Sequence, residues 1–230
     1  MNAEKEILES WQVNAHAWTN AIAQNEIESR LLVTNQAIID AALAENPFNY
    51  LDLGCGEGWL CRAIATQSKE VQTIEGWDAI ESLITNAKQL SSPNIHYRTI
   101  SYQAIIGQQI DAAKKFNLIS INFALFENEL VKDLLQAIKI LFAENGTLII
   151  QTLHPVMACG DLPYQSGWRE GSWAGFSNAF SKAHPWYFRT LENWVQLFTE
   201  LNYSIKQMKE PLHPKTGKPA SVIFVLENNK

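Results

Sequence analysis

The chain has 230 residues, of which 47% are hydrophobic and 18% are charged, and this composition is typical of a folded globular protein. Its net charge of −6 is spread along the chain, which argues against an extended nucleic-acid surface, because phosphate binding needs a basic patch. The first residues lack the apolar core of a signal peptide, and no stretch approaches the roughly 18 apolar residues of a membrane helix. We therefore expect a cytoplasmic protein, monomeric or homodimeric, that binds neither nucleic acid nor membranes.

The first 46 residues predict an N-terminal helical cap. Apolar residues recur at helical spacing over residues 3–24 and again over residues 26–45, which predicts two helices. Pro47 ends this region, because a proline disfavours helix at the residue before it.

Residues 47–153 alternate between short apolar strands and longer amphipathic helices. The predicted strands are 49–54, 71–77, 95–100, 116–125 and 147–153, and the predicted helices are 57–67, 80–90 and 129–143. Such alternation implies βαβ units with right-handed crossovers, and therefore a doubly wound parallel sheet with helices on both faces. We expect this region to be the ligand-binding core of a Rossmann-like α/β fold.

The remaining chain departs from this alternation. Residues 154–189 are rich in Gly, Pro, Ser and Trp without periodicity, and such long loops are usually functional, so we expect a lid or substrate-binding insertion here. Residues 190–230 predict a helix at 191–202 and two strands at 203–208 and 220–226, which complete the same domain. A hairpin-like connection joins these two strands, so the last of the seven strands is expected to run antiparallel.

The segment YLDLGCGEGWL, residues 50–60, places Gly54, Gly56 and Gly58 where the first strand ends and a helix begins. Glycine is used where the backbone needs positive φ or where another group must approach it closely. Such a turn, at the carboxyl edge of a parallel sheet, is where these folds bind ligands. Asp78 follows Gly58 by twenty residues, the distance at which dinucleotide folds place an acid for the ribose hydroxyls.

The glycine spacing and the charge of this turn restrict the class of ligand that it can bind. The spacing is G-x-G-x-G rather than the dinucleotide G-x-G-x-x-G, and no P-loop lysine follows. Asp52 and Glu57 add negative charge, which favours a ligand with a cationic part over a pyrophosphate. The structural alternative is that the glycines only make a tight turn and that Asp52 caps the helix.

At these residues the sequence resembles the class I S-adenosylmethionine-dependent methyltransferases. LDLGCGEG resembles their first motif, EGWDAIESLITNAK their second, and FNLISINFAL and LLQAIKILFAENGTLIIQTLHP their later strand motifs. The chain also resembles small-molecule methyltransferases of the ubiquinone-biosynthesis type. The resemblance implies a seven-stranded sheet with one antiparallel strand, S-adenosylmethionine as cofactor and S-adenosylhomocysteine as product. It also implies methyl transfer (EC 2.1.1.-) to a small-molecule acceptor.

The resemblance also implies roles for individual residues. The turn around Asp52, Gly54, Cys55, Gly56 and Gly58 would contact the methionine part of the cofactor, Asp78 the ribose, and Ala79 and Ile80 the adenine. Ser101 and Tyr102 stand where many members have an Asp that contacts the adenine amine, so the chain departs from the family pattern there. Asn122 and Phe123 would lie beside the reacting methyl group. Arg30 would pair with the cofactor carboxylate, unless it is an ordinary surface arginine.

The acceptor is less defined by the sequence. NFAL at residues 122–125 is not the [DN]PPY motif of base N-methyltransferases, and no carboxylate pair at this edge would hold magnesium, so oxygen, carbon or an ordinary amine remain possible acceptors. His154 is a candidate general base, with a hydrogen bond to the backbone as the structural alternative. The candidate acceptor-binding residues are Trp168, Trp186, Tyr187 and Arg189, which could instead pack the lid or form surface ion pairs.

Two other functions fit part of this pattern. A nicotinamide-dependent oxidoreductase shares the glycine turn and the acid, although this sequence lacks a Tyr-x-x-x-Lys pair. A cofactor-binding protein without catalysis also fits, because methyl transfer by positioning needs no signature side chain.

Overall fold

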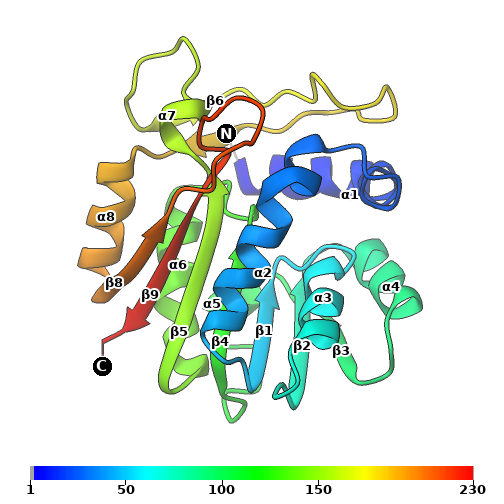
Figure 1. Ribbon diagram of the computed structural model, residues 1–230, viewed down its shortest axis with the longest axis vertical. Helices are drawn as coiled ribbons and strands as arrows, with labels where there is room; N and C mark the ends of the chain where they lie inside the picture. Colours follow the sequence, from blue (N-terminus) through cyan, green and yellow to red (C-terminus); the bar gives the residue numbers. More distant parts are fainter. Residues whose placement is uncertain (1–2, 230) are drawn as a thin grey trace.

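Seven strands form one sheet in the order β3-β2-β1-β4-β5-β9-β8 in the computed structural model, which describes residues 3–229 (Figure 1). The strands are β1 (Asn49–Leu53), β2 (Thr73–Asp78), β3 (Ile95–Thr99), β4 (Phe116–Asn122), β5 (Phe142–Leu153), β8 (Tyr203–Lys209) and β9 (Ser221–Asn228). All neighbouring pairs are parallel except those of β9, which runs antiparallel to both β5 and β8. This arrangement confirms the predicted doubly wound sheet with one antiparallel strand, and it places the reversal of strand order between β1 and β4.

Helices cover both faces of the sheet, and two helical segments precede it (Figure 1). The α-helices are α1 (Ala3–Ala23), α2 (Asn35–Ala44), α3 (Trp59–Gln67), α4 (Glu81–Leu90), α5 (Tyr102–Ile106), α6 (Glu129–Ala137), α7 (Pro155–Ala158) and α8 (Leu191–Glu200). A π-helical turn, Arg30–Thr34, leads directly into α2.

Alternate residues of the central strands enter different cores, as the two-residue period of a strand requires. Leu51 and Leu53 of β1 pack with α5, α6 and α8, whereas Tyr50 packs with α2, α3 and α4 on the opposite face. The same alternation holds in β9, where Phe224 faces the first core and Ile223 the second. Both faces of the central strands are therefore buried, and functional groups can reach a ligand only at the strand ends.

A chain of polar groups crosses the second core between β1 and β4. The Ser120 hydroxyl donates to Asp52 Oδ1 at 2.6 Å, and the Tyr50 hydroxyl lies 2.6 Å from Ser120 Oγ. All three side chains are buried. Asp52 and Ser120 are register partners in the sheet, so the carboxyl group is held inside the core and does not cap α3.

The fifth strand begins earlier than the sequence pattern predicts. The helix predicted over residues 129–143 ends at Ala137, a 3₁₀ turn follows at Ile138–Leu141, and β5 starts at Phe142. Phe142 pairs with Phe116, and the register then shifts beside Asn145, whose φ is +57°. The apolar run before Glu144 fits either helical or strand periodicity, and burial of the Phe142 ring in the core selects the strand.

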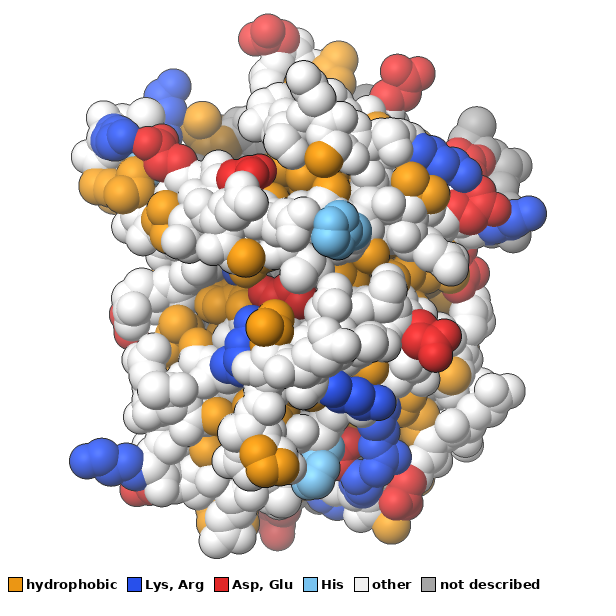
Figure 2. Space-filling view, turned by 90° about the vertical axis from the view of Figure 1, so that its right-hand side faces the viewer, with side chains coloured by type: hydrophobic (Ala, Val, Ile, Leu, Met, Phe, Trp, Pro, Cys, Tyr) orange, Lys and Arg blue, Asp and Glu red, His pale blue; other side chains and the backbone are white. Residues whose placement is uncertain are grey.

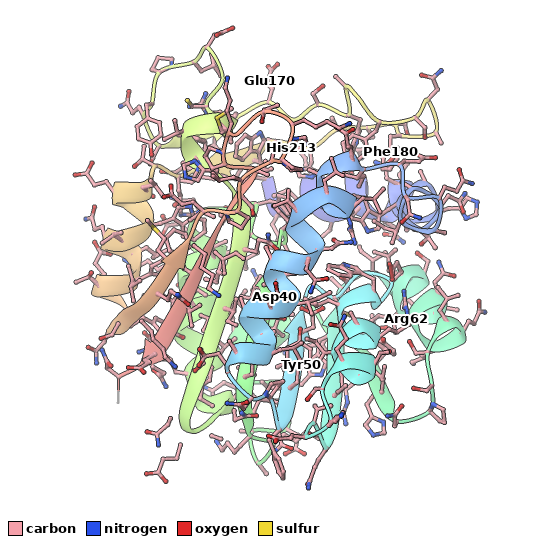
Figure 3. The ribbon with its side chains drawn as sticks, viewed as in Figure 1. Asp40, Tyr50, Arg62, Glu170, Phe180 and His213 are labelled. Atoms are coloured by element: carbon pink, nitrogen blue, oxygen red, sulfur yellow. The ribbon has the colours of Figure 1, made fainter. Side chains whose placement is uncertain are left out.

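Helix α1 and residues 154–189 lie together above the carboxyl edge of the sheet (Figure 1). The latter segment contains α7 and a small antiparallel pair, β6 (Gly167–Arg169) and β7 (Trp186–Phe188), and we call it the lid. Phe180 of the lid packs against Ala17 and Ala21 of α1, and Figure 3 shows it in this upper layer.

Hydrogen bonds hold α1 against the lid. The buried Asn14 amide donates to the Ser181 carbonyl at 2.6 Å, and its Oδ1 accepts from the Ser181 N–H at 2.8 Å. The Ser10 hydroxyl donates to the Lys182 carbonyl at 2.6 Å. Within residues 3–229, no helix has both the length and the hydropathy needed to cross a membrane.

The Asn14→Ala variant tests this contact between α1 and the lid. It removes both hydrogen bonds to Ser181, an exposed residue whose backbone groups can then bond to water, so each lost bond costs only ~0.5–1.5 kcal/mol. We expect faster amide hydrogen exchange at Ser181 and its neighbours, with the strands of the sheet still protected. Asn20→Ala removes an exposed amide from the same helix and serves as control. Equal exchange in both variants would show that Asn14 does not hold the lid.

Candidate functional site

A cavity of about 420 Å³ lies between the carboxyl edge of the sheet and the layer formed by α1 and the lid. On the face seen in Figure 2, hydrophobic side chains are visible in the seam between this upper layer and the α/β part below. Part of the wall consists of residues predicted to bind the cofactor: Arg30, Asp52, Gly54, Cys55, Gly56, Asp78, Ala79, Ile80, Ser101, Tyr102, Asn122 and Phe123. The cavity therefore brings together side chains from five separate loops and helices.

Each glycine of the turn has a positive φ, and two of them also have a packing constraint. A Cβ on Gly54 would lie 2.5 Å from the Ala124 Cβ, so this glycine lets the ends of β1 and β4 approach closely. A Cβ on Gly58 would lie 2.4 Å from the Tyr97 hydroxyl, and Gly58 does not line the cavity. Gly56 has open space around it, with Trp18 Nε1 at 3.7 Å, and is the glycine free to meet a ligand.

Four backbone N–H groups of the turn donate hydrogen bonds within the protein. Gly54 and Cys55 donate to the Trp77 carbonyl at 2.8 and 3.1 Å, Gly56 donates to Asp78 Oδ2 at 2.9 Å, and Gly58 donates to the Cys55 carbonyl. A phosphate cradle needs such groups free to point at the anion. This turn therefore offers the cavity few free N–H donors.

Asp78 lies at the end of β2 and faces the cavity. Its Oδ1 accepts from the Ile80 N–H at 2.8 Å, and its Oδ2 accepts from Gly56. Burial raises the pKa of this carboxyl above its ordinary value, although the backbone donors partly oppose that change. Each oxygen retains a further lone pair, so the carboxylate can still accept from two hydroxyl groups of a ligand.

Arg30 is a half-buried cation whose guanidinium forms no ion pair within residues 3–229, although the charge of Glu57 partly opposes the effect of burial on its pKa. Its guanidinium lies 4.6 Å from the Trp59 ring and 5.7 Å from the Trp18 ring, and burial lowers its pKa to about 10. No carboxylate or carbonyl of residues 3–229 forms a hydrogen bond or ion pair with it. Glu57, whose charge the sequence placed near a ligand, pairs instead with Arg62 at 2.9 Å and lies outside the cavity wall.

Asp52 contributes a titratable group to the same wall. Its side chain is 2% exposed, and desolvation raises the pKa of the carboxyl from 3.8 to about 7, although the bond from Ser120 opposes this. A carboxyl group with such a pKa changes charge near neutral pH, and a cation placed beside it would lower that pKa and favour the ionised form.

The residues after β3 close the cavity near Asp78. Ser101 caps α5, and its hydroxyl oxygen accepts from the Ala104 N–H at 3.1 Å. The buried Tyr102 hydroxyl donates to the Ala124 carbonyl at 3.2 Å and so joins this loop to the end of β4. The Ser101 hydroxyl keeps its own proton free to donate to a ligand.

The end of β4 carries two features that are typical of a functional site. Asn122 Oδ1 is buried and has no hydrogen-bond donor within the described chain. Phe123 adopts φ +51°, a left-handed conformation that is unfavourable for a bulky residue, and its N–H donates to the Gln151 carbonyl at 2.8 Å. Strained backbone and an unsatisfied polar atom therefore meet at the point where β1 and β4 diverge.

The lid supplies only part of the acceptor-binding set expected from the sequence. Trp186, Tyr187 and Arg189 line the cavity, whereas Trp168 does not and is 47% exposed. The buried Arg189 guanidinium donates to the carbonyls of Glu127 and Asn128 at 2.9 and 2.8 Å. Burial lowers its pKa to about 10, and its bonds hold the loop that follows β4.

His154 lies outside this cavity. Its Nε2 is 2.7 Å from Glu210 Oε1, and its Nδ1 is buried with no partner in the described chain. Only its neighbours Leu153 and Pro155 reach the cavity wall. The structure therefore does not bring this histidine to the other predicted site residues.

Several aromatic residues of the wall were not singled out from the sequence as site residues. They are Trp11 and Trp18 of α1, Phe126 after β4, and His184 of the lid. Trp11 and Trp18 are seven residues apart, a spacing that puts both on one face of a helix and could have indicated them. No group of three or more His, Cys, Asp or Glu side chains in residues 3–229 is arranged to hold a metal ion.

The comparisons agree with this geometry. The family model described as "Methyltransferase domain" matches residues 26–207, while no curated protein matches the chain. A putative S-adenosylmethionine-dependent methyltransferase from Listeria monocytogenes is 19% identical, with a TM-score of 0.64 over 84% of this chain and 96% of that one. An S-adenosylmethionine-dependent methyltransferase from Mesorhizobium loti is 18% identical, with a TM-score of 0.63 over 83% and 95% of the two chains.

A third solved structure covers almost all of this chain. The complex of DhpI with S-adenosylhomocysteine (SAH) is 10% identical, with a TM-score of 0.68 over 99% of this chain and 97% of that one. Likeness at such low identity shows the fold, whereas the family model spans most of the sequence. The chain therefore belongs to the methyltransferase-domain family and has the fold of the class I S-adenosylmethionine-dependent methyltransferases.

Proposed function

We propose that this protein transfers a methyl group from S-adenosylmethionine to a small-molecule acceptor, at oxygen, nitrogen or carbon. The observation that carries the proposal is a cavity in which four N–H groups of the glycine turn already bond within the protein, while the Arg30 guanidinium forms no ion pair within residues 3–229. Such a site suits a ligand that carries both a cationic centre and a separate carboxylate, as a methionine-derived sulfonium does.

The residues present fit this cofactor from one end to the other. Arg30 would hold the carboxylate, and the ammonium group would lie by the carbonyls of the turn and by Asp52. Asp78 would accept hydrogen bonds from the ribose, with Ala79, Ile80 and Ser101 around the adenine. When bound, the cofactor supplies a methyl group on positively charged sulfur. The chain's own contribution is to align the acceptor with that methyl and to exclude water.

The same geometry disfavours a nicotinamide dinucleotide. A pyrophosphate would need N–H donors at the turn, but four of them already bond within the protein. Asp52 beside the turn would also repel a phosphate once it is ionised. The similar proteins include the DhpI complex with SAH and the NodS N-methyltransferase complex with S-adenosylhomocysteine, which supports the proposal for this chain.

Calorimetric titration with S-adenosylmethionine, S-adenosylhomocysteine and NADH tests the cofactor. We expect the first two to bind and NADH not to bind. Arg30→Gln should weaken both by about tenfold to 100-fold, because it removes a charge-assisted hydrogen bond worth ~1.5–3 kcal/mol. Arg98→Gln, which removes an arginine outside the cavity wall, should leave the affinity unchanged. Binding of NADH alone, or equal affinity in the two variants, would contradict this assignment.

Titration at several pH values tests Asp52. Its folded-state pKa of about 7 makes it neutral below pH 7, when it attracts a cation less strongly. We expect the affinity for S-adenosylmethionine to fall as pH decreases from 8 to 6, by at most about tenfold per unit for one proton. Asp52→Asn should bind more weakly at pH 8 and show no such slope.

The same variant should be more stable at pH 8. Burial raises the pKa of Asp52 from 3.8, its ordinary value, to about 7 in the folded protein. The protonated carboxyl therefore stabilises the folded state below pH 3.8, and this contribution to the free energy of unfolding is lost as pH rises through 7. Asparagine removes the buried charge and can still accept from Ser120. We expect the melting temperature at pH 8 to rise by ~2–4 °C for each kcal/mol relieved. A lower melting temperature would show that the charge of Asp52 is not costly.

A further inference from the structure

The aromatic part of the cavity contains polar ring atoms that nothing in the described chain satisfies. The indole Nε1 atoms of Trp11 and Trp173 are both buried without a hydrogen-bond acceptor. The two rings lie 5.6 Å apart at 87°, and each is about 6 Å from the His184 ring, at 6.0 and 6.1 Å. A buried donor without a partner is costly, so two of them on one cavity wall indicate a ligand that accepts hydrogen bonds there.

His184 is the third polar ring at this place. It is 8% exposed, and its Nδ1 lies 2.9 Å from the Pro185 carbonyl oxygen. A carbonyl can only accept, so Nδ1 carries the proton of the neutral imidazole and Nε2 carries the lone pair. No side chain or backbone group of residues 3–229 contacts Nε2 with a hydrogen bond. Burial lowers the pKa of this histidine, which keeps the ring in its neutral, basic form at neutral pH.

The surroundings hold this imidazole beside the end of β4. The Phe126 ring contacts it at 4.9 Å, and the Tyr187 N–H donates to the Phe126 carbonyl at 2.7 Å. Two parts of the lid are in close contact here: a Cβ on Gly171 would lie 1.9 Å from the His184 carbonyl oxygen, so only glycine fits at this position. Asn122, Phe126 and His184 line the same cavity, so the imidazole borders the space in which the methyl group would be presented.

We propose that His184 is the general base of the reaction and that the acceptor is a small planar molecule with a weakly acidic hydroxyl, as in a phenol. This inference rests on the proposed function. The hydroxyl would donate to His184 Nε2 while its oxygen accepts from the indole N–H groups of Trp11 and Trp173, and the aromatic ring would pack among the side chains of the wall.

The step balances without another reactant. The hydroxyl oxygen forms a bond to the methyl carbon, the carbon–sulfur bond breaks, and its electron pair stays on sulfur, which becomes a neutral thioether. His184 Nε2 takes the hydroxyl proton and later releases it to water. The positive charge of the sulfonium is thereby replaced by that of the imidazolium, which the Pro185 carbonyl stabilises through Nδ1–H.

The pattern of donors and acceptors favours a hydroxyl over the other acceptor groups. The cluster offers two N–H donors and one nitrogen lone pair, and a hydroxyl is both an acceptor and a donor. The one lone pair of a neutral amine is needed for the bond to the methyl carbon, whereas a hydroxyl oxygen has two lone pairs and can also accept from an indole; a carbon acceptor has no polar group at the reacting atom. The residues that form this cluster carry no carboxylate to neutralise an ammonium ion.

Nitrogen NMR of ¹⁵N-histidine-labelled protein tests the base directly, with phenol and its methyl ether anisole as probes and S-adenosylhomocysteine present. We expect His184 to carry its proton on Nδ1 in the free protein. Phenol should shift the Nε2 resonance, whereas anisole, which has no hydroxyl proton, should not. A proton on Nε2 in the free protein, or an Nε2 signal unaffected by phenol, would overturn the proposal.

Affinity provides a readout that a merely structural histidine would not change. We expect the wild-type protein to bind phenol more tightly than anisole by about tenfold or more, the effect of one buried hydrogen bond. His184→Gln should lose this preference and keep its affinity for anisole and for S-adenosylmethionine. The matched control is His154→Gln, which replaces the buried histidine outside the cavity and should retain the preference.

The controls separate this inference from the proposed function. If the wild-type protein fails to bind S-adenosylmethionine, the proposed function is wrong and this inference falls with it. If the cofactor binds but His184→Gln still prefers phenol to anisole, only the role of His184 is wrong. If phenol transfer is measured, His184→Gln should lower its rate by about 10²–10⁴-fold, the usual contribution of a general base.

Discussion

The hydrogen bonds that join the glycine turn to the end of β2 determine most of the candidate site. The Trp77 carbonyl accepts from Gly54 and Cys55, and Asp78 accepts from Gly56, so three successive N–H groups point away from the ligand. This arrangement, with the bond from the Ile80 N–H, fixes the Asp78 carboxylate in one orientation. Trp77 is itself held by its indole bond to Glu75 at 2.9 Å, so the orientation of the turn is anchored in the core.

The same edge of the sheet carries groups that are unfavourable in the absence of a ligand. Asp52 is buried with a pKa near neutrality, and within residues 3–229 Asn122 Oδ1 has no hydrogen-bond donor and the Arg30 guanidinium has no ion-pair partner. Each of these groups would lower its energy on meeting a group of complementary charge or hydrogen-bonding type. Because Asp52 lines the same cavity as Asn122 and Arg30, removing its buried charge should raise stability and weaken the binding of a cationic ligand.

Much of the fold could be predicted because its periodicity is strong. The strand–helix alternation and the glycine turn indicate the doubly wound sheet, and the hairpin connection before Ser221 indicates its antiparallel strand. The start of β5 could not be predicted, because the run before Glu144 suits two periodicities and only packing decides between them. The pairing of Glu57 was also not predicted, because its carboxylate bonds to Arg62 instead of facing a ligand.

The acceptor part of the site was harder to predict for a reason of topology. His154 has a recognisable position at the end of a strand, but its side chain turns to Glu210 of a distant loop. His184 lies in a segment without periodicity, and its position depends on contacts with Phe126 and Trp11, which come from two other parts of the chain. A lid obtains its geometry from the elements it covers, so its functional residues emerge only when α1, β4 and the lid are assembled. In this chain the predicted cofactor-binding residues come from local motifs, whereas the proposed acceptor-binding residues come together only through contacts between segments distant in sequence.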